Sequence, residues 1–146
     1  MANIPNSMLY WWPLLKDTPG VSAPRTFIIP LPPFDPSVLL DGEPLPQGIL
    51  QAVADAGDDL GWPCFLRTDH TSCKHDWERT CYLPSPDVIA QHIYALAEGS
   101  AMVSIIGLPF QALIVREFLQ LDSTFKAFQG LIPISRERRY FVQDGH

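Results

Sequence analysis

Polar side chains crowd into a short stretch that directly follows an apolar run. The sequence GWPCFL, residues 61–66, is typical of a buried strand, and RTDHTSCKHDW, residues 67–77, comes next. Three structures fit such a loop: a phosphate-holding site, a metal site, or an ordinary solvated turn. The side chains that could take part are Arg67, Asp69, His70, Ser72, Lys74, His75 and Asp76.

The metal interpretation depends on four ligand-type side chains, His70, Cys73, His75 and Cys81. Structural zinc is usually bound by Cys and His in paired short spacings. The spacing found here, H-x2-C-x-H-x5-C, matches no common pattern. Zinc is therefore the minor alternative, and no metal ligand is predicted.

Two other groups of charges interrupt apolar runs. In ALIVREFL, Arg116 and Glu117 stand near the end of a predicted strand, where they could reach a cleft or form an ion pair at the sheet margin. In RERRYFV, strand alternation places Glu137 and Arg139 on one face. Such a strand borders water or an anion, or it is an edge strand that charges protect from aggregation.

The composition limits the class of protein. With 146 residues, 47% hydrophobic and 18% charged, the chain should form one globular domain. Its net charge of −6 argues against general nucleic-acid binding, and no apolar run is long enough to span a membrane. Three cysteines, an odd number, favour reduced thiols and a cytoplasmic location. The clustered basic residues indicate a local site for a small anion.

The elements that must position these residues can be read from periodicity and proline content. Residues 1–46 hold most of the 15 prolines and should form a wrapped segment with one strand at 25–31. A short helix is expected within 7–17, where Pro13 permits only the helix start. Residues 47–146 complete one compact unit.

Two main helices are predicted in the second segment, at 47–61 and 85–99, with Gly99 as the stop of the latter. Apolar runs give the strands between and after them. This order predicts an α+β fold with a mixed or antiparallel sheet. The expected strands are 62–67, 112–119, 124–135 and 136–145.

Taken in order, four stretches resemble the ATP-grasp superfamily, which includes carboxylate–amine ligases. GVSAPRTFII is similar to the segment that precedes the grasp, and WPCFLRTDHTSCKHDW to its basic strand and flexible phosphate-covering loop. ALIVREFLQLD resembles the hinge strand near the adenosine. PISRERRYFVQDG resembles the E-x-R-x-F-V strand of the second grasp subdomain. The resemblance covers nearly the whole chain.

The resemblance implies an ATP-binding domain related to ligases that activate a carboxylate as an acyl phosphate. Arg67, at the end of a rigid strand, would be a fixed cation for the phosphates. Ser72, Lys74 and His75, on the loop, would cover the phosphates and exclude water.

The adenosine and the transferred phosphoryl group would meet residues from the later stretches. Glu117 would accept hydrogen bonds from the ribose or the adenine amino group, and the backbone near Leu119 would contact the base edge. Arg139, beside Glu137, would stabilise the transferred group.

The sequence departs from the family pattern in two places. Cys73 stands in the loop where a glycine is expected, which costs energy if that position has a positive φ. The family's magnesium ligands lie on strands after the E-x-R strand, whereas this sequence stops at QDGH. We therefore expect an incomplete second subdomain, a weak magnesium site, and a sheet end that invites a partner chain or self-association.

An alternative function comes from a different class: a non-catalytic interaction module, or half of a split protein that a partner completes. Geometry separates the two hypotheses. A nucleotide site requires Arg67, Glu117 and Arg139 to converge on one cleft with the loop of Lys74 above it.

Overall fold

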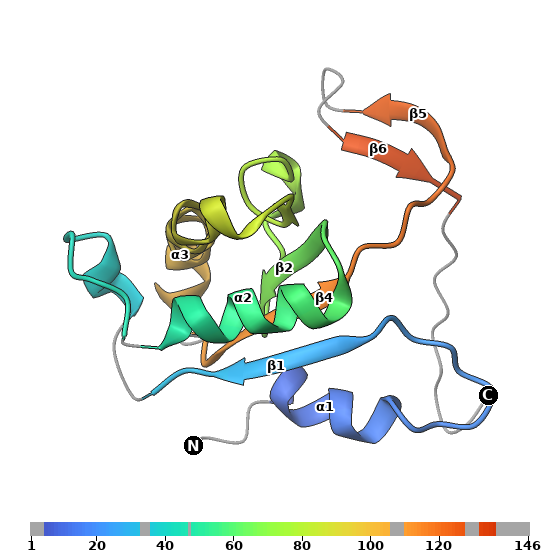
Figure 1. Cartoon of the computed structure of the whole chain (residues 1–146), viewed down its shortest axis with the longest axis horizontal. Helices are drawn as coiled ribbons and strands as arrows, with labels where there is room; N and C mark the ends of the chain where they lie inside the picture. The colour runs from blue at the N-terminus through green and yellow to red at the C-terminus, as the bar shows by residue number, and fades with distance from the viewer. Residues whose placement is uncertain (1–4, 33–35, 47, 106–109, 128–131, 137–146) are drawn as a thin grey trace.

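A computed structural model describes residues 5–32, 36–46, 48–105, 110–127 and 132–136. Figure 1 shows the chain as helices and strands labelled in sequence order. Three α-helices, three short 3-10 helices and six strands occupy the described residues. They are α1 (Met8–Leu15), β1 (Thr26–Pro30), η1 (Pro36–Leu39), α2 (Ile49–Leu60), β2 (Cys64–Thr68), η2 (Lys74–Asp76), β3 (Tyr82–Leu83), η3 (Pro86–Val88), α3 (Ile89–Ile105), β4 (Ala112–Glu117), β5 (Ser123–Ala127) and β6 (Ile132–Ser135).

The strands form two antiparallel sheets. The larger has the order β1-β4-β2-β3, and β5 pairs with β6 in a separate two-stranded sheet that extends from the end of β4 (Figure 1). Within the larger sheet, Phe65 of β2 lies opposite Arg116 of β4, and Arg67 lies opposite Ile114. The predicted α+β class is confirmed, and every strand pair in the described residues is antiparallel.

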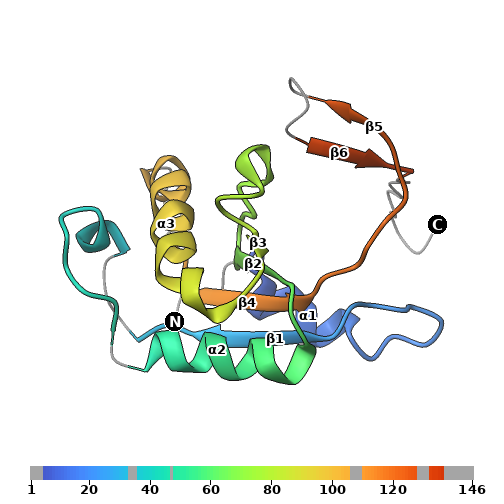
Figure 2. The same cartoon turned by 45° about the horizontal axis from the view of Figure 1, so that its top comes forward.

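Alternation along the strands gives the larger sheet two buried faces. Leu66, Leu113 and Val115 point to the main core, which α2 and α3 cover. The opposite face is covered in part by α1, whose Met8 and Trp12 pack on Ala112 and Ile114. Figure 2 shows α1 separated from α3 by the strands. Because β4 is buried on both faces, it reads as a continuous apolar run.

The first helix continues through Pro13, contrary to the expectation that this proline permits only a helix start. α1 extends from Met8 to Leu15, and Ser7 caps it by accepting a hydrogen bond from the Leu9 N–H. Pro13 lies in the second turn, so its missing N–H removes only one intrahelical bond before the helix ends. Burial of Trp12 against the sheet offsets that loss.

The third helix does not stop at Gly99 but continues to Ile105, so that prediction was wrong. A Cβ on Gly99 would lie 2.6 Å from the Sγ of Cys73, on the loop that packs against this helix. Gly99 therefore serves a close approach between helix and loop. Cys73 itself adopts the left-handed conformation, with φ of 49° and ψ of 35°, which a β-carbon makes costly.

The contact between Gly99 and Cys73 predicts a reversal of sign in a double-mutant cycle. In the wild-type background, Gly99→Ala should lower the free energy of unfolding by about 1–3 kcal/mol through overpacking. In a Cys73→Gly background the clash is gone, and the same substitution should stabilise the helix by about 1 kcal/mol. Urea denaturation of the four proteins measures both effects. Equal effects in the two backgrounds would contradict the contact.

The C-terminal strands differ from the expected pattern. Instead of one strand at 124–135, the structure has β5 and β6 as two paired strands. Gly130 and Pro133 are residue types that interrupt a strand, and their presence in the sequence favours such a division. The predicted strand at 136–145 lies outside the described residues, except for Arg136, which is exposed.

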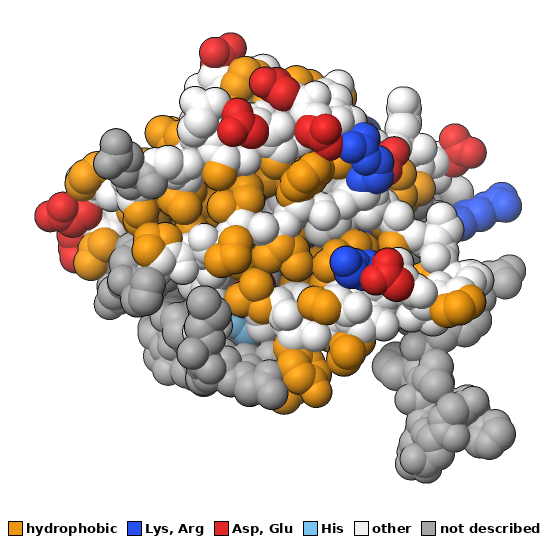
Figure 3. Space-filling model, turned by 60° about the horizontal axis from the view of Figure 1, so that its bottom comes forward, with side chains coloured by type: hydrophobic (Ala, Val, Ile, Leu, Met, Phe, Trp, Pro, Cys, Tyr) orange, Lys and Arg blue, Asp and Glu red, His pale blue; other side chains and the backbone are white. Residues whose placement is uncertain are grey.

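Hydrophobic side chains also remain on the surface. Figure 3 shows them among charged groups over much of the face turned toward the viewer. Exposed apolar side chains also occur in the segment that follows β4 and in β5, where Leu121 is 58% and Phe125 is 60% exposed. Exposed apolar surface of this kind is what the interaction-module alternative requires.

Candidate functional site

A cavity of about 690 Å³ opens where β2 and β4 approach the β5–β6 pair. Its walls come from five parts of the chain: Pro24 before β1, the start of β2, the loop and strand around η2 and β3, the end of β4 with the segment that follows it, and β6. Both Lys74 and Glu117 line it, as does Leu119. These three predicted nucleotide-binding residues therefore share one pocket although they are far apart in the sequence.

Aromatic side chains form one wall of this pocket. Trp77 and Phe118 are nearly parallel, with ring centroids 6.3 Å apart and planes 14° from each other. The Tyr82 ring packs edge-on against both, at 4.8 Å from Trp77 and 5.2 Å from Phe118. Phe65 of β2 adds a fourth ring to the lining. Such a wall suits a planar, largely apolar group.

Two part-buried arginines, Arg67 on β2 and Arg116 on β4, lie on the same face of the larger sheet beside the pocket. Arg116 lines the pocket, its guanidinium lies 5.3 Å from the centre of the Trp12 ring, and its Nε donates to Thr26 Oγ1. Arg67 is two residues beyond Phe65 on β2 and donates from Nε to the Thr68 carbonyl. Among the residues that the structure describes, neither arginine forms an ion pair with a carboxylate.

The electrostatic surroundings of these arginines are unfavourable for positive charge. Burial lowers the pKa of Arg67, and the positive charge of Arg116 lowers it further, while Asp69 and Cys81 raise it. Burial also lowers the pKa of Arg116. Because buried cations are normally paired, two neighbouring ones without a carboxylate partner favour an anion at this place.

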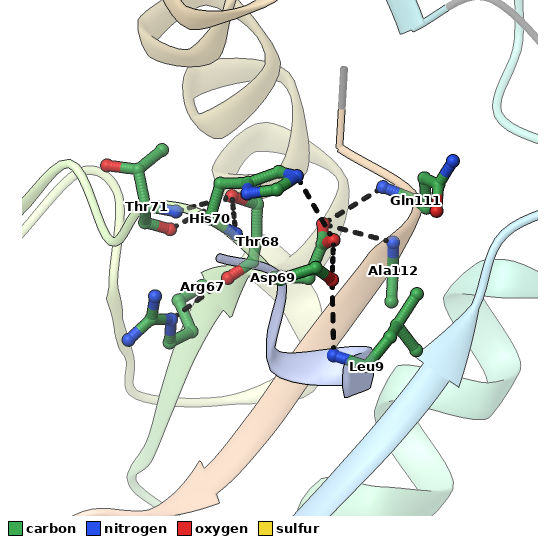
Figure 4. A network of polar contacts seen from close by, with 9 residues as sticks. Leu9, Arg67, Thr68, Asp69, His70, Thr71, Gln111 and Ala112 are labelled. Carbon is green, nitrogen blue, oxygen red and sulfur yellow. Dashed lines mark hydrogen bonds and ion pairs between the residues drawn. The ribbon is translucent and has the colours of Figure 1, made fainter. Parts of the chain in front are cut away.

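A buried carboxylate holds the loop and β2 in position. Asp69 is fully buried, and its Oδ1 accepts hydrogen bonds from the backbone N–H groups of Gln111 at 2.9 Å and Ala112 at 3.3 Å. Its Oδ2 accepts from Ser7 Oγ and lies 3.4 Å from His70 Nε2. Figure 4 shows this network at the end of β2. The network ties α1 and the start of β4 to the residue after β2.

The turn that leads into the loop is fixed by Thr68. Its Oγ1 accepts hydrogen bonds from the N–H groups of Thr71 at 2.9 Å and His70 at 3.3 Å (Figure 4). Further along, Thr80 Oγ1 donates to the carbonyls of Cys73 and Asp76. The polar residues of the loop thus serve mainly to fold it. Side-chain caps of this kind replace missing backbone partners in tight turns.

The predicted site residues are only partly brought together. Ser72 and His75 are on the same loop as Lys74 but do not line the pocket. Arg67 lies beside the pocket rather than in its wall. Arg139 and Glu137, the predicted catalytic residues, lie outside the described residues.

The sequence also allowed an ion pair of Arg116 or Glu117 at the sheet margin and a zinc site in the loop. Within the described residues, Glu117 forms no ion pair; its Oε2 accepts from the backbone N–H of Arg25 at 3.3 Å. For zinc, the part of the chain described here contains no group of three His, Cys, Asp or Glu side chains that could hold a metal ion. Nor does a helix in that part have the length and apolar character to cross a membrane.

Two buried thiols near the site predict a pH dependence of stability. Burial raises the pKa of Cys81 to about 11, and burial, followed by the charge of Asp58, raises that of Cys64 to about 11. Their ordinary value is 9.0, so above pH 9 the unfolded chain loses these protons first. The stabilisation is complete below about pH 9 and is lost as pH rises through 11.

Urea denaturation in reducing buffer between pH 8 and 11 tests this expectation. The free energy of unfolding should fall over the upper part of that range, and Cys81→Ala should make the fall shallower. An unchanged slope in the variant would show that Cys81 titrates alike in both states.

Sequence reasoning missed several wall residues. Tyr82 belongs to a strand of only two residues, too short for a periodic signal. Trp77 belongs to the loop of residues 67–77, yet its partner Phe118 comes from the distant segment that follows β4, so nothing local indicated the stack. Comparison with family models, curated proteins and solved structures found no match.

Proposed function

We propose that this chain binds ATP in the pocket beside β2 and β4, in the manner of an ATP-grasp domain. The observation that carries the proposal is the placement of two part-buried arginines, Arg67 and Arg116, next to an aromatic-lined cavity, with no ion-pair partner for either among the described residues. A nucleoside triphosphate has both a planar base and several negative charges. It would satisfy the aromatic wall and the cations at once.

In this proposal each part of ATP meets the residues predicted to bind it. The base occupies the aromatic end, where the backbone near Leu119 reaches its edge, and Glu117 accepts from the ribose. Lys74, exposed on the loop, covers the phosphates together with Arg67. This division follows the order of the motifs in the family resemblance.

Magnesium is not assigned to residues. The described part of the chain offers no group of metal ligands, so no step is derived through a metal ion. In the related ligases, a carboxylate oxygen attacks the γ-phosphorus of ATP and ADP leaves, which gives an acyl phosphate. The proposal for this chain is nucleotide binding, and carboxylate activation is the reaction class to which such binding would belong.

Isothermal titration of the full chain with ATP, ADP and adenosine, with and without Mg²⁺, tests the proposal. Affinity should rise with the number of phosphates, because each added charge meets Arg67, Arg116 or Lys74. It should also weaken as salt is added. Equal heats for ATP and buffer would contradict nucleotide binding and would leave the interaction module as the better hypothesis.

A further inference from the structure

The aromatic wall contains a residue that comes from the loop rather than from the sheet. Trp77 directly follows η2, three residues after Lys74, and its carbonyl accepts a hydrogen bond from the Tyr82 N–H at 2.8 Å. Its indole crosses to Phe118, in the segment that follows β4. This stack joins the loop to the segment that follows β4.

The geometry of this stack leaves part of each ring uncovered. The centroid separation of 6.3 Å is at the long end of the range for aromatic pairs, which is about 4.5–7 Å. Trp77 and Phe118 therefore cover each other only in part, and both side chains remain half-buried. The Tyr82 ring makes a T-shaped contact with each of the two rings, at centroid distances shorter than 6.3 Å, and so supports both.

The charged groups around the stack suit the parts of a nucleotide that extend from its base, the ribose and the phosphates. Lys74 and Arg116 line the same cavity as Trp77, and so does Glu117. If a base lies against the indole, the attached phosphates would extend toward the positive charges of Arg116 on the sheet and Lys74 on the loop. An indole offers the largest aromatic face among side chains for stacking on a base.

We propose that Trp77 is a base-stacking residue of the pocket: its indole stacks on the base of the bound nucleotide and thereby holds the Lys74 loop closed over the phosphates. This inference rests on the proposed nucleotide site. It assigns to the loop a second role, since the same segment contacts the base through Trp77 and the phosphates through Lys74.

Two substitutions separate stacking from apolar volume. Trp77→Leu removes the aromatic face and should weaken both adenosine and ATP by roughly 5- to 100-fold, as expected for loss of one base stack. Trp77→Phe keeps an aromatic face and should retain most of the affinity. Inorganic tripolyphosphate, which has no base, should bind the wild type and Trp77→Leu equally well.

Fluorescence provides a second readout that does not depend on the stability of the leucine variant. ATP should change the tryptophan emission of the wild type, and this change should be strongly reduced in Trp77→Phe, where Trp12 beside Arg116 is the remaining indole next to the proposed phosphate site. Trp62→Phe is the matched control, because the Trp62 ring lies against Gly57 of α2 and does not line the pocket. The control should keep the full change.

The outcomes distinguish this inference from the proposed function. If ATP binds the wild type and Trp77→Leu with equal affinity, or if Trp77→Phe keeps the fluorescence change, Trp77 does not stack on the base while the nucleotide site stands. If the wild type binds neither ATP nor adenosine, both proposals are wrong.

Discussion

Replacing Asp69 by alanine is expected to lower the free energy of unfolding by about 3–5 kcal/mol. The carboxylate is fully buried and accepts from Ser7 Oγ and from the N–H groups of Gln111 and Ala112. Alanine would leave all three donors buried without a partner, and each such group costs about 1–3 kcal/mol. Urea denaturation at neutral pH measures the loss.

Asp76→Ala is the matched control for this prediction. Asp76 is exposed and forms a surface ion pair with Arg79 at 3.1 Å, which contributes at most about 1 kcal/mol. Asp69→Asn is a milder change that keeps shape but converts half of the acceptor into a donor. Similar losses for Asp69→Ala and Asp76→Ala would show that the buried network does not hold α1 and β4 to the loop.

Arg67→Met is expected to have the largest effect on ligand binding. It should lower the affinity for ATP and raise the stability of the unliganded chain. Loss of a charge-assisted contact to phosphate should weaken ATP by roughly 10- to 100-fold. The unliganded chain should become more stable by about 1 kcal/mol, because a half-buried cation next to Arg116 is replaced by an apolar side chain. Titration calorimetry and urea denaturation measure the two effects.

Arg79→Met controls for the general loss of positive charge. Arg79 is on the same loop, but it is exposed, pairs with Asp76 and does not line the aromatic pocket. Its replacement should leave ATP affinity within about twofold of the wild type. An equal loss of affinity in both variants would mean that ATP is attracted by net charge and not held by Arg67.

The elements with long apolar patterns could be predicted from the sequence. The helical period from Ile49 and the buried run through β4 both correspond to elements of the structure. The errors fall where tertiary contact overrides a local rule. Gly99 is read as a stop by itself, but in the fold it admits Cys73 against the helix. Pro13 is tolerated because Trp12 is buried.

The candidate site could be predicted only as far as motif order allows. Lys74 lies on the predicted loop, Glu117 and Leu119 lie in the predicted strand 112–119, and all three share one pocket. Whether Arg116 forms an ion pair could not be derived, since the partner of a charged side chain depends on neighbours far away in the chain. The Trp77–Phe118 stack is hidden for the same reason.

Thermal unfolding of the full chain with and without MgATP tests the central claim most directly. A ligand that binds only the folded state adds about 2.7 kcal/mol at a hundred times its dissociation constant. The account predicts a clear rise of the melting temperature with MgATP, strongly reduced in Arg67→Met and retained in Arg79→Met. A well-folded wild type whose melting temperature does not move with MgATP would contradict it.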